Sequence, residues 1–145
     1  MEALADRLTA LSAEARSELV VYGTYEAMCE LAELVPDIRT FSREHVLSCL
    51  KQYEFMAWTG FIPPSCHHTI VLLPLDYAPY LWGWPNDLVS DMQAVGTEVV
   101  LVGPMTNGDN YLGGIDDLET LDAIDPDYAG SIWTNRVELI GPIVR

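Results

Sequence analysis

The chain has 145 residues, of which half are hydrophobic and a fifth are charged. This composition fits one compact globular domain and excludes collagen, coiled coil and bulk disorder. Acidic residues number 22 against 7 Lys plus Arg, so the formal net charge is −15. A surface this negative repels phosphate backbones and anionic lipid headgroups, so we expect no nucleic-acid partner and no anionic membrane surface.

The first half of the chain alternates helical and extended patterns. Leu4, Leu8 and Leu11 recur at helical spacing and predict an amphipathic helix over residues 1–16. A strand over 18–22, a helix over 24–34 and a strand over 37–41 follow. Ser42 is then placed to cap a helix over 42–53.

The second half continues the alternation after a loop that contains Gly60, Pro63 and Pro64. We predict strands over 69–75, 97–102 and 131–134. A helix begins at Pro85 and ends at Gly96, a short helix starts with the capping sequence at 116–119, and a last one covers 136–140. Residues 105–114 are predicted to form a Gly/Asn-rich loop.

Apolar strands separated by helices predict a mostly parallel sheet in a single α/β domain over residues 1–145. From length and periodicity, a five-stranded doubly wound parallel sheet fits best. The last three strands begin about 30 residues apart, which also matches the strand–helix unit of an eight-fold TIM-type barrel. The residue pattern alone leaves both architectures open.

Targeting signals and cysteines bear on the compartment. Residues 1–17 carry scattered charges and no apolar segment of a signal peptide, and the apolar stretch 69–84 is too short and interrupted to span a bilayer. Cys29, Cys49 and Cys66 are odd in number and widely spaced, so we predict no disulfide framework and three small buried side chains. A cytoplasmic, reducing location is the simplest interpretation.

Several motifs have both a functional and a structural interpretation. The segment 80–87 (YLWGWPND) is either an aromatic wall over a ligand pocket or a hydrophobic plug over the sheet. Side chains of residues adjacent in the sequence rarely point at one common atom. This argues against a metal site or a Cys–His nucleophile at 65–68 (SCHH). The acidic residues between 116 and 127 suggest a solvated helix face. Arg136 is suited to clamp a phosphate, and equally to cap carbonyls or to pair with Glu138.

The order of several motifs resembles the C-terminal half of a bacterial glycerophosphodiester phosphodiesterase. The segment 132–136 (IWTNR) is similar to that family's last-strand motif, with Asn135 where Asp is usual. The segments 58–66 (WTGFIPPSC), 69–86 (TIVLLPLDYAPYLWGWPN), 98–104 (EVVLVGP) and 113–121 (GGIDDLETL) resemble the same family in the same order. The resemblance covers roughly residues 19–144.

This resemblance implies a TIM-type barrel, a divalent metal (Mg or Ca) and hydrolysis of glycerophosphodiesters to glycerol 3-phosphate and an alcohol. The family's early His-Arg pair, its Glu-x-Asp and its His-Asp, which hold the metal and move protons, have no counterpart here. We therefore expect a catalytically incomplete chain that binds no metal alone. A half barrel leaves sheet edges uncovered, so self-association or pairing with a missing N-terminal half is expected.

Within that family fold the expected substrate-binding residues are Asp76, Trp84, Trp133, Asn135 and Arg43, with Tyr22 as a further candidate. The two tryptophans are assigned to the glycerol or alcohol group, and Arg43 or Arg136 to the phosphate. Two alternatives stay open. One is a non-catalytic acidic α/β binding module that docks a partner through residues 77–84, and the other is a hydrolase that uses His67 or His68.

Overall fold

The computed structural model describes residues 1–105 and 113–144. The strands in these residues are β1 (Val20–Tyr22), β2 (Arg39–Phe41), β3 (Ile70–Pro74), β4 (Glu98–Val102) and β5 (Ser131–Ile132). The α-helices are α1 (Glu2–Thr9), α2 (Ala13–Ser17), α3 (Tyr25–Leu34), α4 (Arg43–Met56), α5 (Asn86–Ala94), α6 (Leu118–Asp122) and α7 (Val137–Ile140). Three short 3₁₀ turns are η1 (Ala57–Thr59), η2 (Pro64–Cys66) and η3 (Ala78–Tyr80). Most of the predicted loop 105–114 falls on 106–112, outside the described residues.

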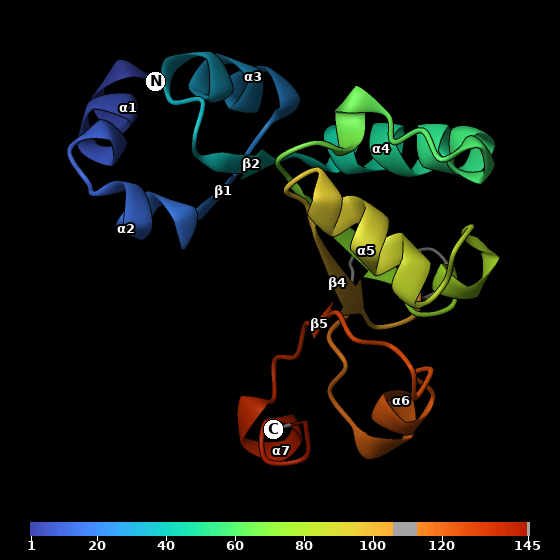
Figure 1. The fold of residues 1–145 in the computed structure, drawn as a ribbon. Helices are drawn as coiled ribbons and strands as arrows, with labels where there is room; N and C mark the ends of the chain where they lie inside the picture. Colours follow the sequence, from blue (N-terminus) through green and yellow to red (C-terminus); the bar gives the residue numbers. More distant parts are fainter. Residues whose placement is uncertain (106–112, 145) are drawn as a thin grey trace.

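The strands form two small parallel sheets, β1–β2 and β3–β4–β5, in which neighbours are consecutive in the sequence (Figure 1). The alternation of strands and helices and the parallel pairing are thus confirmed. The single five-stranded sheet is not formed as such, although the Thr69 hydroxyl donates to the Thr40 carbonyl at 2.8 Å and joins the start of β3 to β2. The reversal of strand order that defines a doubly wound sheet occurs in neither described sheet, and the described strands close no barrel.

Two apolar clusters hold the elements together. In the larger one, Val71 and Leu73 of β3 and Val99 and Leu101 of β4 share one face, because alternate residues of a strand point the same way. Helices α4 and α5 cover that face with the buried side chains Val46, Cys49, Leu50, Tyr53, Leu88, Val89 and Met92. The smaller cluster joins α1 to α3 through Ala5, Leu8, Met28, Leu31, Val35 and Ile38.

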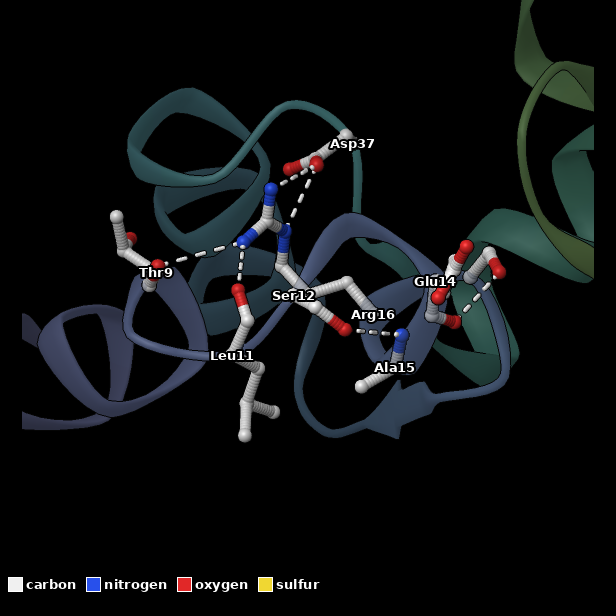
Figure 2. Close-up of polar contacts among 8 residues, drawn as sticks. Thr9, Leu11, Ser12, Glu14, Ala15, Arg16 and Asp37 are labelled. Carbon is white, nitrogen blue, oxygen red and sulfur yellow. Dashed lines mark hydrogen bonds and ion pairs between the residues drawn. The ribbon is translucent and has the colours of Figure 1, made fainter.

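The predicted helix over residues 1–16 is wrong in its length, because the chain breaks between α1 and α2. Ser12 starts the second helix by accepting a hydrogen bond from the Ala15 amide at 3.1 Å. The Arg16 guanidinium donates to the Leu11 and Thr9 carbonyls, at 2.6 and 3.3 Å, and pairs with Asp37 at 2.7 Å (Figure 2). These contacts satisfy carbonyls at the end of α1 and tie the bend to the loop before β2.

Helix starts and stops follow local chemistry, as predicted from the sequence. The Ser42 hydroxyl accepts from the His45 amide at 3.1 Å, and the Asp117 carboxylate accepts from the Thr120 amide at 2.8 Å. Gly96 follows α5 with a φ of +75°, a conformation that favours glycine. Pro85 lies directly before α5 rather than inside its first turn.

The predictions for the cysteines need correction. Cys49 on α4 and Cys66 in η2 form a disulfide, and both are fully buried. Their separation of 17 residues in the sequence does not predict the distance between the two sulfur atoms. That distance is set by the packing of α4 against η2. Cys29 is a free thiol, but it is exposed rather than buried.

None of the helices in residues 1–105 and 113–144 is long and apolar enough to cross a bilayer.

Candidate functional site

The carboxyl ends of β3, β4 and β5 meet at one edge of the larger sheet, where α/β proteins place their ligands. Residues 113–116 run between the ends of β4 and β5. The Gly103 amide donates to the Gly113 carbonyl at 2.7 Å, and the Ile115 amide donates to the Trp133 carbonyl at 2.8 Å. A Cβ at Gly103 would lie 2.7 Å from the Gly114 carbonyl oxygen, so this close approach requires glycine.

Asp116 is the centre of a hydrogen-bond network at this edge. Its Oδ1 accepts from the Asn135 amide at 2.6 Å and from the Thr134 hydroxyl at 3.1 Å, and its Oδ2 accepts from Asn135 Nδ2 at 2.9 Å. The Asn135 side-chain amide, followed by its backbone amide, holds the pKa of the Asp116 carboxyl below its usual range. Asp116 is therefore an anion at neutral pH, and it fixes the orientation of Asn135.

Asp76 and Trp133 belong to the same edge. Asp76 follows β3, is exposed, and accepts a hydrogen bond from the Met105 amide, just beyond β4, at 3.0 Å. Trp133 directly follows β5 and leaves about half of its surface accessible. The structure thus brings three of the predicted site residues, Asp76, Trp133 and Asn135, to the carboxyl ends of one three-stranded sheet.

Arg43 and Tyr22 lie at the carboxyl ends of the smaller sheet. Arg43 is the exposed first residue of α4, two positions after β2. The rings of Tyr22 and Phe41, which end β1 and β2, have centroids 4.8 Å apart. A pocket of about 400 Å³ beside these strand ends is lined by Thr24, Tyr25, Glu26, Glu44 and Ser48. Its two carboxylates oppose the binding of a phosphate there.

Trp84 does not join these residues. Its ring stacks on Tyr128 with centroids 5.2 Å apart, and it packs partly buried against the larger apolar cluster. The Tyr128 hydroxyl donates to the Ser131 carbonyl at 2.9 Å and lies 3.1 Å from that of Val99, so it is anchored where β4 and β5 begin. For Trp84 this arrangement matches the hydrophobic plug. A substrate contact through Trp84 stays a prediction.

The other motifs resolve into structural contacts. The Cys66 sulfur is bonded to Cys49, so Cys66 is no thiol nucleophile in this structure. The His67 ring lies 3.2 Å from the Ile62 carbonyl oxygen, and the His68 ring lies against Gly96. Arg136 pairs with Glu138 at 3.2 Å, which is one of its expected structural roles.

The side chains that the structure describes form no group that fits a divalent metal. Within residues 1–105 and 113–144, no group of three or more His, Cys, Asp and Glu side chains converges on one point. Asp76 and Asp116, the carboxylates at the sheet edge, are each engaged by hydrogen-bond donors.

Two residues of the network were not predicted from the sequence. In the sequence, Asp116 belongs to an acidic stretch that suggests a solvated helix face, and Thr134 stands out only as part of the last-strand motif. Asp116 and Thr134 are 18 positions apart in the sequence, so a local periodicity does not predict their contact. The adjacent Gly113-Gly114 pair was the available signal, since paired glycines mark a close backbone approach.

Comparisons with known proteins leave the chain unassigned to a family. No protein-family model, no curated protein and no solved structure matches it significantly.

Proposed function

We propose that this chain forms the C-terminal part of a glycerophosphodiester phosphodiesterase-like barrel. In this proposal it supplies one wall of the substrate site and leaves metal binding and proton transfer to residues outside this chain. The proposal starts from the resemblance of an ordered series of motifs that ends in Ile132-Trp133-Thr134-Asn135-Arg136. The parallel strands, paired with their neighbours in sequence order, are what such a barrel segment requires.

The observation that carries the proposal is the Asp116 network at the carboxyl edge of the larger sheet. Asn135 stands where the family motif usually has Asp, and three hydrogen bonds to Asp116 fix it and its neighbour Thr134. A network of this kind suits a residue that contacts a ligand, because it removes rotamer freedom before binding. Barrel enzymes bind their substrates at this end of the strands.

An ion pair between β2 and β4 supports a curved sheet. The Arg39 guanidinium on β2 reaches past β3 to the Glu98 carboxylate on β4, with an N–O distance of 3.1 Å. Glu98 also accepts from the Ser131 hydroxyl of β5 at 2.7 Å. In barrels, side chains from alternate strands meet in layers on the inner face. A contact between β2 and β4 is therefore what curvature toward a barrel favours.

The chemistry of the edge suits the glycerol part of a substrate better than its phosphate. Carboxylates such as Asp76 accept hydrogen bonds from hydroxyl groups, and the exposed Trp133 ring offers an apolar face to carbon atoms. The phosphate requires cations. Arg43, which is outside the lining of the acidic pocket, stays the proposed one, whereas Arg136 is engaged by Glu138.

The test is to restore the other half of the site. The DNA upstream of the Met1 codon is sequenced, and any N-terminal half with the His-Arg, Glu-x-Asp and His-Asp motifs is produced together with this chain. We expect hydrolysis of glycerophosphocholine with Mg²⁺ or Ca²⁺ by the joined protein and none by this chain alone. Trp133→Ala should raise KM, whereas Leu47→Ala, a similarly exposed residue on α4, should not.

The contrary result is equally clear. Stop codons directly upstream with no separate N-terminal half, or a joined protein without hydrolysis, would overturn the enzyme proposal. The non-catalytic binding module would then be the better account.

A further inference from the structure

We propose that an aromatic surface at the C-terminal end of α4 docks a basic, amphipathic segment of another protein. This surface, which we call the α4 aromatic surface, consists of Phe55, Met56, Trp58, Phe61, Tyr80 and Trp82. It comes from two stretches of chain, the end of α4 with the turn after it and the segment around η3. It shares no residue with the proposed substrate site.

The side chains of this surface are more exposed than their chemistry favours. Tyr80 is 79% exposed, Phe55 77%, Trp58 66% and Trp82 59%. Aromatic rings this exposed lose the burial that drives folding, and contiguous apolar patches on monomers commonly mark interaction sites. Aromatic residues are also the ones that protein interfaces enrich.

Hydrogen bonds hold the two stretches side by side. The hydroxyl of the buried Tyr53 on α4 donates to the Trp82 carbonyl at 3.2 Å. The Tyr77 hydroxyl donates to the Glu54 carboxylate at 3.1 Å. In Figure 1 the end of α4 and the yellow-green segment before α5 lie at the same side of the molecule. The two stretches that carry the exposed rings therefore lie side by side.

The turn after α4 is itself ordered by its own contacts. The Trp58 indole donates to the Phe55 carbonyl at 2.9 Å, and the Thr59 hydroxyl donates to the Met56 carbonyl at 2.6 Å. Behind the turn, the Cys49–Cys66 disulfide ties α4 to the chain that leads into β3. An ordered surface costs less conformational entropy when a partner binds.

The extent of the surface matches that of a protein interface. Aromatic side chains present about 150–250 Å² each, so the exposed fractions correspond to an area on the order of 700 Å². A standard protein–protein interface buries about 800 Å² on each partner, whereas the largest patch on a typical monomer is about 300–600 Å².

Charge identifies the kind of partner. Residues 51–61 and 77–91 contain the acids Glu54, Asp87 and Asp91 but one basic residue, Lys51. Glu54 accepts from the Tyr77 hydroxyl, and the Asp91 carboxylate lies 3.3 Å from the Tyr53 hydroxyl oxygen, so both carboxylates lie beside the tyrosines that join the two stretches. Apolar rings interleaved with carboxylates complement a segment with one apolar face and Lys or Arg beside it.

The same charges disfavour the other occupants. A second copy of the chain would bring another net charge of −15 against this face. An anionic bilayer would be repelled for the same reason. The inference does not rest on the phosphodiesterase proposal, and its test measures no hydrolysis.

The test measures the binding of synthetic peptides to the full 145-residue chain by titration calorimetry. The probe is an amphipathic Leu/Lys helix of about 18 residues, long enough to cross the surface. Its controls are a Ser/Lys peptide of equal charge and a Leu/Glu peptide of opposite charge. We expect the Leu/Lys peptide to bind, the Leu/Glu peptide not to bind, and added salt to weaken binding.

Variants separate the surface from the net charge. The double variant Trp58→Ser/Trp82→Ser should weaken Leu/Lys binding by about tenfold or more, because buried tryptophans dominate such interfaces. Val137→Ser on α7, 70% exposed in the wild type, is the matched control and should leave the affinity unchanged. If the double variant does not fold, Tyr80→Ser alone should weaken binding in the same direction.

Three results would overturn the inference. Equal affinity for the Ser/Lys peptide, or for the double variant, would mean that charge alone attracts the probe. Binding of phosphatidylcholine vesicles in place of the peptide, lost in the double variant, would make the surface a membrane contact. A concentration-dependent dimer of the wild type that the double variant lacks, without peptide binding, would make it a self-association face.

Discussion

Opening the Cys49–Cys66 disulfide is expected to lower the free energy of unfolding by about 3 kcal/mol. The bridge joins residues 17 positions apart, and closing a loop of this length removes that much conformational free energy from the unfolded chain. Both sulfurs are fully buried, between α4 and η2. The bridge therefore fastens a helix of the larger apolar cluster to the start of β3.

The assay is urea unfolding followed by tryptophan fluorescence, with and without dithiothreitol. For a denaturant slope of about 2 kcal/mol per molar urea, the midpoint should fall by about 1.5 M on reduction. The urea midpoint of the double variant Cys49→Ala/Cys66→Ala should fall at least as far, since this variant also lacks two buried sulfur atoms. Cys29→Ser is the control, because Cys29 is exposed and unbridged.

Two results would refute this reasoning. Thiol titration of the unfolded, unreduced chain should find one free thiol, that of Cys29, and three would mean that the bridge is absent. An unchanged urea midpoint on reduction, despite one free thiol beforehand, would mean that the bridge does not constrain the unfolded chain as argued.

Three further predictions concern single positions. Asn135→Ala should raise the pKa of Asp116 toward its ordinary value, as followed by NMR titration, and an unchanged titration would contradict the role of Asn135. Because the pKa of Asp116 is lower in the folded chain than in the unfolded one, the network stabilises the fold fully above the ordinary pKa. That stability is lost as the pH falls through the folded pKa. Gly103→Ala should cost about 1–3 kcal/mol in urea unfolding, since its Cβ would meet the Gly114 carbonyl, whereas Gly113→Ala, whose Cβ would meet nothing within 4 Å, should cost less. Ser42→Ala should lower the free energy of unfolding by about 1 kcal/mol through loss of the α4 cap, and thermal unfolding at an unchanged temperature would speak against it.

The site was predictable in part. Asp76, Trp133 and Asn135 follow apolar strands in the sequence, and parallel pairing places the ends of such strands at one edge. Trp84 has the same sequence signature, yet it stacks on Tyr128, 44 positions later in the chain. Asp116 is one acid among several in its stretch, and its bonds to Asn135 single it out. Contacts between segments this far apart depend on how the layers pack, which a local pattern does not contain.

The sequence by itself determined the order of strands and helices, their parallel pairing and several of their ends. Apolar spacing and caps such as Ser42, Asp117 and Gly96 act within a few residues, so the printed chain reveals them. Tertiary structure alone decided the break that Arg16 stabilises, the Cys49–Cys66 bridge and the division into two sheets. Each of these depends on distances between segments, which are set only when the apolar faces of strands and helices are buried together.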